Sequence, residues 1–410
     1  MREFRVTYLP HQLAVYQATA PNVVYVKGRR AGGTHGAVNR LLELAHSRPG
    51  SRHLWVDTVH RNIGRYVRRY FLPALRGWPY QWRQAENSLH FSTGAYCDFG
   101  SAQRPENIEG FGYDTLWVNE AGIVLADEGL YYNTLLPMLA EASSAQAFFI
   151  GAPKGPGLFE QMYQWGQDPT RKDWASFRHA SHDNPFLARA TLEALRQTMP
   201  ERVYRQEILA EFLEGEDAVF RDVQSIATAS EEGPLPGVRY AMGVDLARYE
   251  DHTVVWVARA DNRQAIHCAR WHRLPWAEQA RRIAELARRF NHAQAWVDAT
   301  GVGDPICEML AGLGVYVSPV HLTHGTKQQL IDQLALGIEQ GDVRIFPHGE
   351  TLRELAAYRA TPLPGGGFRT GGRGAHDDCV IALALCYWGL SHHGPGFILG
   401  KETLSSEQPG

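Results

Sequence analysis

Three aspartates in the second half of the sequence stand at the edges of apolar segments. Asp245 and Asp298 each end a short apolar run that is typical of a strand, and Asp378 opens an apolar stretch that continues to residue 390. Carboxylates from distant segments can together hold two divalent cations, which need several anionic oxygens to offset their mutual repulsion. Mg²⁺ prefers oxygen ligands of this kind. The pattern therefore predicts a two-metal site that cleaves phosphodiester bonds.

Other polar residues near these three aspartates are candidates for the same site. Asp377 is an alternative ligand to Asp378, because adjacent residues at a helix start point in different directions. We interpret Asp251 and His376 as neighbours that support the site, and Lys327 either as a contact to substrate phosphate or as a solvated lysine. The alternative interpretation of Asp245 and Asp298 is that they are strand-end acids at a turn. The alternative for Asp377 and Asp378 is that their charges complement the helix dipole.

A glycine-rich segment, Lys27-Gly-Arg-Arg-Ala-Gly-Gly-Thr, lies between a predicted strand and a predicted helix in the first half of the sequence. Backbone N–H groups in such a loop, together with the helix N-terminus, favour phosphate. The alternative is a glycine-rich turn that binds no ligand. The position of the loop predicts a nucleotide site.

The loop departs from the Walker A pattern G-x-x-x-x-G-K-[ST]. One register uses Gly28 and Gly33 as the two glycines. The other places Gly32 and Thr34 as the last glycine and the hydroxyl residue, with Gly33 in the lysine position. Both registers lack the lysine, so the candidates for the missing positive charge are neighbouring basic residues: Lys27, Arg29 and Arg30.

A second nucleotide-site element is expected where the strand Thr115-Leu-Trp-Val ends in Asn119-Glu120. A Walker B strand ordinarily ends in Asp-Glu, with the aspartate at Mg²⁺ and the glutamate at the attacking water. Glu120 is therefore the predicted catalytic base, and Asn119 offers only a neutral oxygen. The alternative is that Glu120 is an acid at a helix start.

Composition limits the class of protein. With 410 residues the chain is long enough for two domains, and its 44% hydrophobic and 21% charged content is that of a globular protein. No apolar run reaches a membrane-spanning length, and the N-terminus lacks the apolar core of a secretion signal. Five scattered cysteines favour reduced thiols in a cytosolic setting. The net charge of −3 is uninformative, but arginines cluster at residues 65–69 and 281–289.

The order of predicted elements indicates two α/β domains. Strands alternate with helices in the first half, which predicts a parallel-sheet P-loop ATPase domain of the ASCE type over 1–214. The second half reads βββαβαβα with acids on its first and fourth strands, which predicts a ribonuclease H-like nuclease domain over 238–392. We expect a turn-rich linker over 215–237 and a disordered tail over 393–410.

Taken in order, these motifs resemble the large terminase subunit of tailed bacteriophages, over residues 8–390. The matching segments are Gly28-Arg-Arg-Ala-Gly-Gly-Thr, the strand end at Glu120, Gly243-Val-Asp-Leu-Ala, Val297-Asp-Ala-Thr-Gly-Val-Gly-Asp-Pro and His376-Asp-Asp-Cys. Gln12 lies where the family places a glutamine that reads adenine. The resemblance departs at Gly33, at Asn119 and at Glu109, where members usually have lysine, aspartate and, in many cases, arginine.

The resemblance implies a viral packaging motor that hydrolyses ATP to move double-stranded DNA into a procapsid and cuts concatemeric DNA. It implies one Mg²⁺ with ATP and two Mg²⁺ or Mn²⁺ ions at the nuclease site. The implied ATP-binding residues are Gln12, Gly28, Arg29, Arg30, Gly32, Gly33 and Thr34, with Glu120 catalytic. The implied nuclease ligands are Asp245, Asp298 and Asp378, with Asp377 as the alternative.

Implied partners are double-stranded DNA, the portal protein, the small terminase subunit and further copies of the chain in a ring on the procapsid, with no membrane. The implied location is the host cytoplasm, transiently on the procapsid and not in the mature virion. Three alternatives stay open. One is a ribonuclease H-like nuclease or recombinase whose N-terminal half only binds. The others are a non-enzymatic assembly protein, which the intact carboxylates disfavour, and a helicase, for which a second set of motifs is missing.

Overall fold

The computed structural model describes residues 6–108, 110–142, 144–155, 157–213, 218–247, 251–301, 303–362, 368–372 and 376–392. Glu109 and the predicted tail 393–410 lie outside these residues. The chain divides into two compact units, one formed by Met1–Asp217 with Thr361–Arg369 and the other by Ala218–Ala360 with Thr370–Gly410. None of the described helices combines the length and apolar character that a membrane crossing requires.

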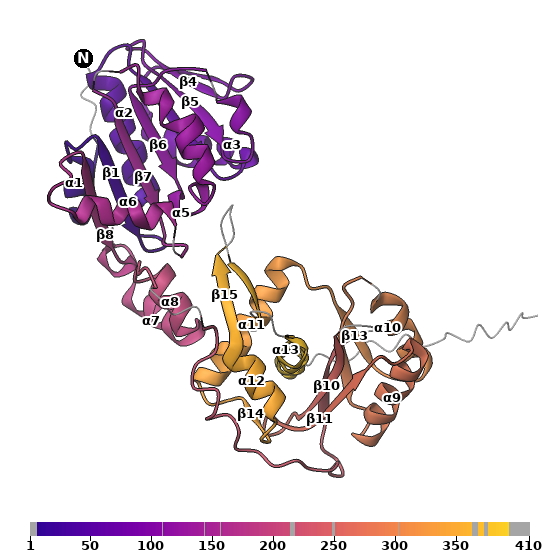
Figure 1. Ribbon diagram of the computed structural model, residues 1–410. Helices are drawn as coiled ribbons and strands as arrows, with labels where there is room; N and C mark the ends of the chain where they lie inside the picture. Colours follow the sequence, from indigo (N-terminus) through magenta and orange to yellow (C-terminus); the bar gives the residue numbers. More distant parts are fainter. Residues whose placement is uncertain are drawn as a thin grey trace, which may run out of the picture. The chain divides into compact units, whose positions relative to one another are not determined.

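The described part of the first unit contains an eight-stranded sheet in the order β3-β4-β5-β2-β6-β7-β1-β8 (Figure 1). The six strands from β5 to β8 in this order pair in parallel, and β3 and β4 extend one edge in antiparallel fashion. The strands are β1 (Asn22–Lys27), β2 (Arg52–Asp57), β3 (Tyr80–Arg83), β4 (Ser88–Phe91), β5 (Tyr96–Ser101), β6 (Thr115–Asn119), β7 (Gln146–Gly151) and β8 (Trp174–His179).

Helices cover both faces of this sheet, as the alternation of strands and helices predicts. The α-helices of this unit are α1 (Pro10–Tyr16), α2 (Gly33–Ser47), α3 (Ile63–Tyr66), α4 (Leu72–Ala74), α5 (Ala121–Val124), α6 (Leu158–Gln167), α7 (Arg189–Thr198) and α8 (Glu201–Glu207). Short π-helical segments at Val67–Phe71 and Leu130–Leu135 and 3₁₀ turns at His60–Asn62, Pro105–Asn107, Pro137–Leu139 and Ser181–Asp183 complete it.

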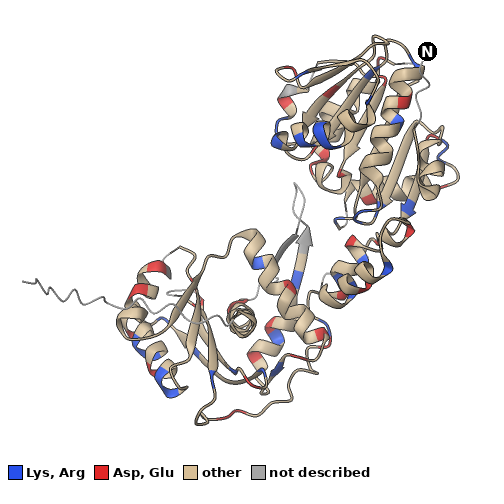
Figure 2. Cartoon of the chain, turned by 180° about the vertical axis from the view of Figure 1, so that it is seen from behind, with Lys and Arg blue, Asp and Glu red and all other residues tan. Residues whose placement is uncertain are grey.

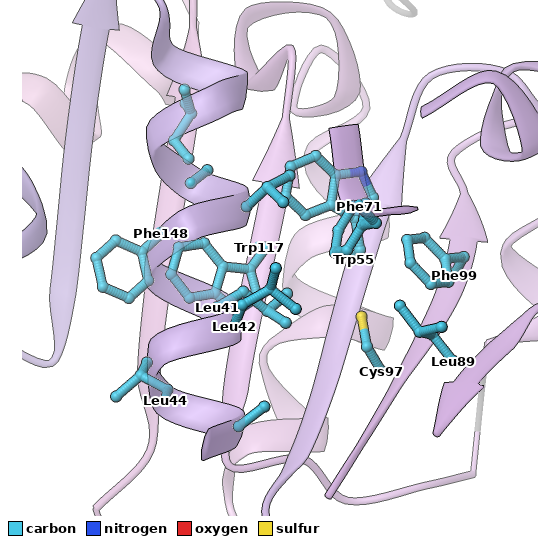
Figure 3. Close-up of a cluster of buried hydrophobic side chains, with 14 of the residues drawn as sticks. Leu41, Leu42, Leu44, Trp55, Phe71, Leu89, Cys97, Phe99, Trp117 and Phe148 are labelled. Atoms are coloured by element: carbon cyan, nitrogen blue, oxygen red, sulfur yellow. The ribbon is translucent and has the colours of Figure 1, made fainter. Parts of the chain in front are cut away.

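The core beneath α2 shows why the strands are apolar on both faces. Trp117 on β6 and Phe148 on β7 stack with ring centroids 4.1 Å apart, and Leu41 and Leu42 of α2 pack in the same cluster (Figure 3). The alternate residues of the strands belong to a second cluster, with α5 and α6. A sheet buried on both faces in this way fixes the β1 and β6 termini at one edge, where ligands bind in open α/β sheets.

The described part of the second unit contains a six-stranded sheet in the order β13-β12-β9-β10-β11-β14 (Figure 1). β10 is antiparallel to β9 and to β11, whereas β12 runs parallel to both β9 and β13. The strands are β9 (Tyr240–Asp245), β10 (His252–Arg259), β11 (Gln264–His272), β12 (Gln294–Asp298), β13 (Val317–Val320) and β14 (Arg344–Ile345).

Five described helices accompany this sheet: α9 (Trp276–Arg289), α10 (Gly303–Gly312), α11 (His324–Glu339), α12 (Gly349–Ala357) and α13 (Asp378–Ser391). Strands β15 (Tyr358–Pro362) and β16 (Phe368–Gly372) form a separate pair. Helix α13 packs on β9 at very short range, because a Cβ on Gly243 would lie 2.0 Å from the Ala382 carbonyl oxygen and 2.2 Å from the Cys386 nitrogen. This contact sets the position of the α13 N-terminus, which carries Asp378.

The predicted fold class is confirmed: a P-loop parallel-sheet domain is followed by a ribonuclease H-like α/β domain. β7 lies between β1 and β6, which is the strand order of the ASCE group.

From Ala218 onward, the described part of the segment that we expected to be a linker packs on the second unit. Ala218 bridges to Arg359, and the Ala229 nitrogen donates to the Ile345 carbonyl.

Candidate nucleotide and nuclease sites

The phosphate loop connects the end of β1 to the start of α2. Arg30 and Gly32 both adopt left-handed backbone conformations, with φ of 63° and 84°. A non-glycine residue in this region is uncommon and marks a tightly constrained turn. The turn leads directly into the N-terminus of α2, whose first N–H groups have no acceptor within the helix and can meet an anion.

Lys27 occupies the space that a side chain at Gly33 would need. A Cβ on Gly33 would lie 3.1 Å from Cδ and 3.2 Å from Cε of Lys27, and 3.1 Å from Cγ2 of Ile150. The lysine is buried, with 6% of its surface exposed, and its Nζ lies 3.3 Å from Oε1 of Glu120. The lysine missing from the Walker A position is therefore replaced in space by the residue at the end of β1.

Glu120 follows β6 directly and has a left-handed backbone, with φ of 55°. Its side chain is 22% exposed, so the carboxylate is partly accessible while Lys27 holds one of its oxygens. A carboxylate at the carboxyl edge of the sheet, beside a lysine and the phosphate loop, is placed as a base for an attacking water.

Thr34 and Asn119 connect the first turn of α2 to the end of β6. The Thr34 Oγ1 donates to the Asn119 Oδ1 at 3.1 Å, and the Asn119 Nδ2 donates to the Asp57 Oδ2 at 2.7 Å. Asp57 ends β2, the neighbour of β6. Our sequence analysis did not select Asp57, although it ends an apolar strand just as Asp245 and Asp298 do.

Arg29 and Arg30 are both exposed but differ in their contacts. The Arg29 Nε donates to the Glu207 Oε2 at 2.5 Å, and Glu207 also pairs with Lys154. Burial acts in the opposite direction, but Lys154 and Arg29 together hold the pKa of Glu207 below its usual value. For the Arg30 side chain, the described residues show no ion pair. Of the two arginines, Arg30 is the one that the described residues leave free to meet a ligand.

Gln12 lies under the loop and uses its amide within the chain. Its Nε2 donates to the Gly32 carbonyl at 2.9 Å, and its Oε1 accepts from the Leu9 nitrogen at 3.0 Å. Gly28 faces the other side, where a Cβ would lie 2.4 Å from the Ile208 carbonyl oxygen. In this structure Gln12 supports the loop, and its contact with adenine stays a prediction.

In the second unit, Asp245 and Asp298 end the neighbouring parallel strands β9 and β12. Val244 and Val297 are register partners, so the two aspartates that follow them stand side by side on the same face of the sheet. The Asp298 Oδ1 accepts from the Thr300 nitrogen at 2.8 Å, which fixes that carboxylate at the strand end. The predicted strand-end pair is thus brought together by β9–β12 pairing.

Helix α13 brings Asp378 to the same edge. Its Oδ2 accepts from the His252 nitrogen at 2.9 Å, which ties the helix start to β10. The preceding residue, Asp377, points differently and pairs with Lys327 on α11, with Nζ 2.9 Å from its Oδ2. Asp378 is therefore the better-placed ligand of the two, and Lys327 is engaged by the chain itself.

Glu354 of α12 was also missed by our sequence analysis. It is 8% exposed, and its Oε2 accepts from the Cys379 and Val380 nitrogens at 2.8 and 3.3 Å. It satisfies N–H groups in the first turn of α13 that have no partner within the helix. A glutamate within a helix is too common a feature for this role to be predicted from the sequence.

The aspartates lie close enough for their charges to influence one another. Burial raises the pKa of Asp245 well above its usual value; Asp378, Asp298 and Asp377 raise it further, and Lys327 opposes them. Asp251 and His376 extend the cluster: the His376 Nδ1 is 2.5 Å from the Asp251 Oδ1, and both have ligand atoms close to Asp378. An accumulation of carboxylate oxygens with one lysine nearby fits hard divalent cations.

The two arginine clusters have different surroundings (Figure 2). On α9, Arg281 pairs with Glu278 and Glu285, and Arg282 pairs with Glu278. The helical segment 61–69, which contains α3, carries several blue stretches in Figure 2, and its arginines are exposed. Among the described residues no ion pair involves its Arg65, Arg68 or Arg69. The structure thus favours a solvated face for α9 and a basic surface for the segment 61–69.

Comparison with known proteins points to one family. The model of the family described as "Terminase RNaseH-like domain" matches residues 242–388. The chain is 29% identical to the "Terminase, large subunit" of Thermus virus P23-45 over 429 aligned residues, covering 93% of this chain and 87% of that protein. Over most of its length the chain is thus similar to large terminase subunits of bacteriophages.

Solved structures of terminases show the same fold. The large terminase of a thermophilic bacteriophage matches 93% of this chain and 98% of its own, with a TM-score of 0.60 and 15% identity. The large terminase nuclease of phage G20c with bound magnesium is 28% identical over 42% of this chain and 98% of its own, with a TM-score of 0.41. The first of these matches shows that the shared fold extends over both units of the chain.

Proposed function

We propose that this chain is a subunit of a viral DNA-packaging motor, which hydrolyses ATP to move double-stranded DNA into a procapsid and cuts concatemeric DNA with a two-metal site. The relationship to large terminase subunits over 93% of the chain supports this role. The observation that carries the proposal is the presence in one chain of two sets of residues: Lys27 beside Glu120 at a phosphate loop, and aspartates from β9, β12 and α13 at one sheet edge.

In the ATPase unit, the N–H groups from Gly32 to Thr34, at the N-terminus of α2, would bind the phosphates. The Gly28 and Arg29 nitrogens instead donate to the His179 and Glu207 carbonyls, which fixes the start of the loop. Lys27 would contact the outer phosphates from the space beside Gly33. The Thr34 hydroxyl would face the nucleotide-associated Mg²⁺. A lysine at the end of β1 performs this task as well as one in the helix, because the position of the charge, rather than its place in the sequence, determines the interaction.

Glu120 would accept a proton from the attacking water, or orient it, at the carboxyl edge of the sheet. In this structure Lys27 holds the carboxylate at 3.3 Å. A phosphate that attracts Lys27 would weaken that contact and leave the carboxylate available to water. Arg30, exposed in the same loop, would stabilise charge that develops on the transferred phosphate.

In the nuclease unit, Asp245, Asp298 and Asp378 would hold two Mg²⁺ or Mn²⁺ ions, with Asp377 as a further ligand. The bound ions would supply Lewis-acid activation of water and stabilisation of the leaving oxygen. The chain's own residues fix the carboxylates: Thr300 orients Asp298, and the His252 nitrogen orients Asp378.

The proposed partners follow from the same role. Double-stranded DNA would contact exposed arginines of the segment 61–69, because phosphate contacts from arginine dominate nonspecific DNA affinity. The portal protein, the small terminase subunit and further copies of this chain in a ring on the procapsid are proposed from the family relationship alone. A location in the host cytoplasm, with transient attachment to the procapsid and absence from the mature virion, follows from these partners.

The decisive experiment measures Mg²⁺-dependent ATP hydrolysis, with and without linear duplex DNA, together with plasmid cleavage. Asp245→Asn should abolish cleavage and leave ATP hydrolysis unchanged, and Glu120→Gln should lower ATP turnover about 10²–10⁴-fold and leave cleavage intact. Asp342→Asn, an exposed acid of the nuclease unit, is the matched control for both activities. Cleavage without any DNA-stimulated ATP turnover would instead favour a nuclease whose N-terminal half only binds.

The role of Lys27 has its own test. Lys27→Ala should lower ATP turnover about 10²–10³-fold, as expected for loss of a charge that stabilises the transition state. The double variant Lys27→Ala/Gly33→Lys should recover much of it, because the lysine returns to the Walker A position. Lys172→Ala, an exposed lysine in the same unit, is the control. Full activity in Lys27→Ala would refute the assignment.

A further inference from the structure

Asp57 and Asn119 form a buried pair at the carboxyl ends of two adjacent strands. Val56 of β2 and Val118 of β6 are register partners, so the residues that follow them stand side by side. Asp57 is 1% exposed and Asn119 is 0% exposed. The pair lies at the end of the strand that carries Glu120, and therefore belongs to the nucleotide site.

Hydrogen bonds define the orientation of the pair. Asn119 must point its Nδ2 at Asp57, because a carboxylate accepts and cannot donate, and the 2.7 Å contact joins that nitrogen to the Asp57 Oδ2. Its Oδ1 consequently faces Thr34, whose hydroxyl donates at 3.1 Å. The other oxygen of Asp57 accepts from the Thr58 nitrogen at 2.7 Å and from the Thr58 Oγ1 at 3.2 Å.

The charge of Asp57 has no cationic partner among the described residues. Its hydrogen-bond donors are the neutral groups of Asn119 and Thr58. Burial raises the pKa of Asp57, and the bonds from Asn119 and Thr58 oppose the rise. A buried carboxylate is costly unless a positive charge compensates it. The Thr34 hydroxyl, which the nucleotide-associated cation would contact, is connected to Asp57 through Asn119 by two hydrogen bonds.

We propose that Asp57 is a positioning residue that supplies, through Asn119, the negative charge that the nucleotide-associated Mg²⁺ receives from a strand-end aspartate in ordinary P-loop ATPases. The charge is displaced by one strand, from β6 to β2. Asn119 presents its carbonyl oxygen toward Thr34 and the cation, and Asp57 polarises the amide and prevents it from rotating. This inference rests on the proposed ATPase function of the first unit.

The relocation of charge can be tested by exchanging the two residues. The measurement is equilibrium binding of a fluorescent ADP analogue to the full chain, titrated with Mg²⁺ and repeated in EDTA. Asp57→Asn should raise the Mg²⁺ concentration for half-maximal stabilisation of binding by about 10-fold or more, in the range known for loss of a residue that orients a metal ligand. The affinity of Asp57→Asn for the ADP analogue in EDTA should stay close to that of the unmutated chain.

The exchange variant Asp57→Asn/Asn119→Asp should return the Mg²⁺ dependence to near that of the unmutated chain, because it restores one carboxylate and one amide in reversed order. Asp173→Asn, an exposed acid in the same unit, is the control. If Asp57→Asn does not fold, Asn119→Ala tests the same relay, since it removes the group between Asp57 and Thr34, and the same Mg²⁺ shift is expected.

Either of two results in Asp57→Asn would overturn the inference alone. One is an unchanged Mg²⁺ dependence; the other is an equal loss of affinity with Mg²⁺ and in EDTA, which would indicate a purely structural role. An exchange variant no better than Asp57→Asn would overturn it as well. Failure of the unmutated chain to bind nucleotide in either condition would overturn the proposed ATPase function, and this inference with it.

Discussion

Acid should destabilise the ATPase unit through His53, a fully buried residue of β2. Burial lowers the pKa of His53 from 6.5 to about 4. Trp117 Nε1 donates to Thr115 Oγ1 at 2.7 Å, and that hydroxyl lies 2.6 Å from His53 Nδ1, while Ser51 Oγ lies 2.9 Å from His53 Nε2. We infer a neutral imidazole that accepts at Nδ1 and donates at Nε2.

The magnitude follows from the two pKa values. Between pH 6.5 and 4 the unfolded chain binds a proton at this histidine that the folded chain does not, so the free energy of unfolding falls as pH falls. With 1.36 kcal/mol for each pKa unit, the loss should reach about 2 kcal/mol at pH 5 and about 3 kcal/mol at pH 4. Stability from this source is fully present above pH 6.5.

Hydrogen exchange detected by mass spectrometry can measure this loss within one unit of the protein. The opening free energy of peptides that cover 53–57 and 115–119 would be followed from pH 7 to pH 4, in the unmutated chain and in His53→Gln. Peptides from β10, residues 254–258, are the internal reference in the other unit. An equal pH slope in both chains would refute the reasoning, whatever the absolute cost of the substitution.

Three further substitutions test the contacts that hold the two sites. Gly243→Ala should destabilise the nuclease unit by about 3 kcal/mol or more in urea unfolding and abolish DNA cleavage, because the new Cβ would overlap the α13 backbone. The control is Gly312→Ala, which has open space around it and should cost much less stability. Glu354→Gln should cost about 1–2 kcal/mol in the same assay and weaken cleavage, since it removes a charge at the α13 N-terminus. Glu207→Gln should lower the stability of the ATPase unit by about 3 kcal/mol, because it leaves the partly buried Lys154 without its anion; an unchanged unfolding midpoint would contradict it.

Strand-end acids were the part of the site that could be predicted from sequence. Asp245 and Asp298 follow runs of apolar residues, and parallel strands place their carboxyl ends at one edge, so the two carboxylates had to be neighbours if β9 and β12 paired. The fold class followed from the same periodicity, because the change from alternating strands and helices to three consecutive strands separates the two domain types.

The order of strands in the sheet could not be predicted, and the remaining site residues depend on it. Asp57 reaches Asn119 only because β2 pairs with β6, which lies far along the chain. Lys27 could be named only as one of three candidates, because its path beside Gly33 depends on the turn between β1 and α2. Glu354 required the docking of α12 against the start of α13.

The dependence of the nuclease site on α13 has a consequence for the time at which the chain becomes able to cut DNA. Synthesis from the N-terminus completes β9 and β12 well before residue 378, so two of the three aspartates are present while the third has not yet been made. The backbone of Gly243 stays uncovered until α13 closes on it. A growing or partly folded chain thus carries an incomplete cation site. Cleavage by the proposed mechanism would therefore require that α13 has packed on β9 and brought Asp378 to the site.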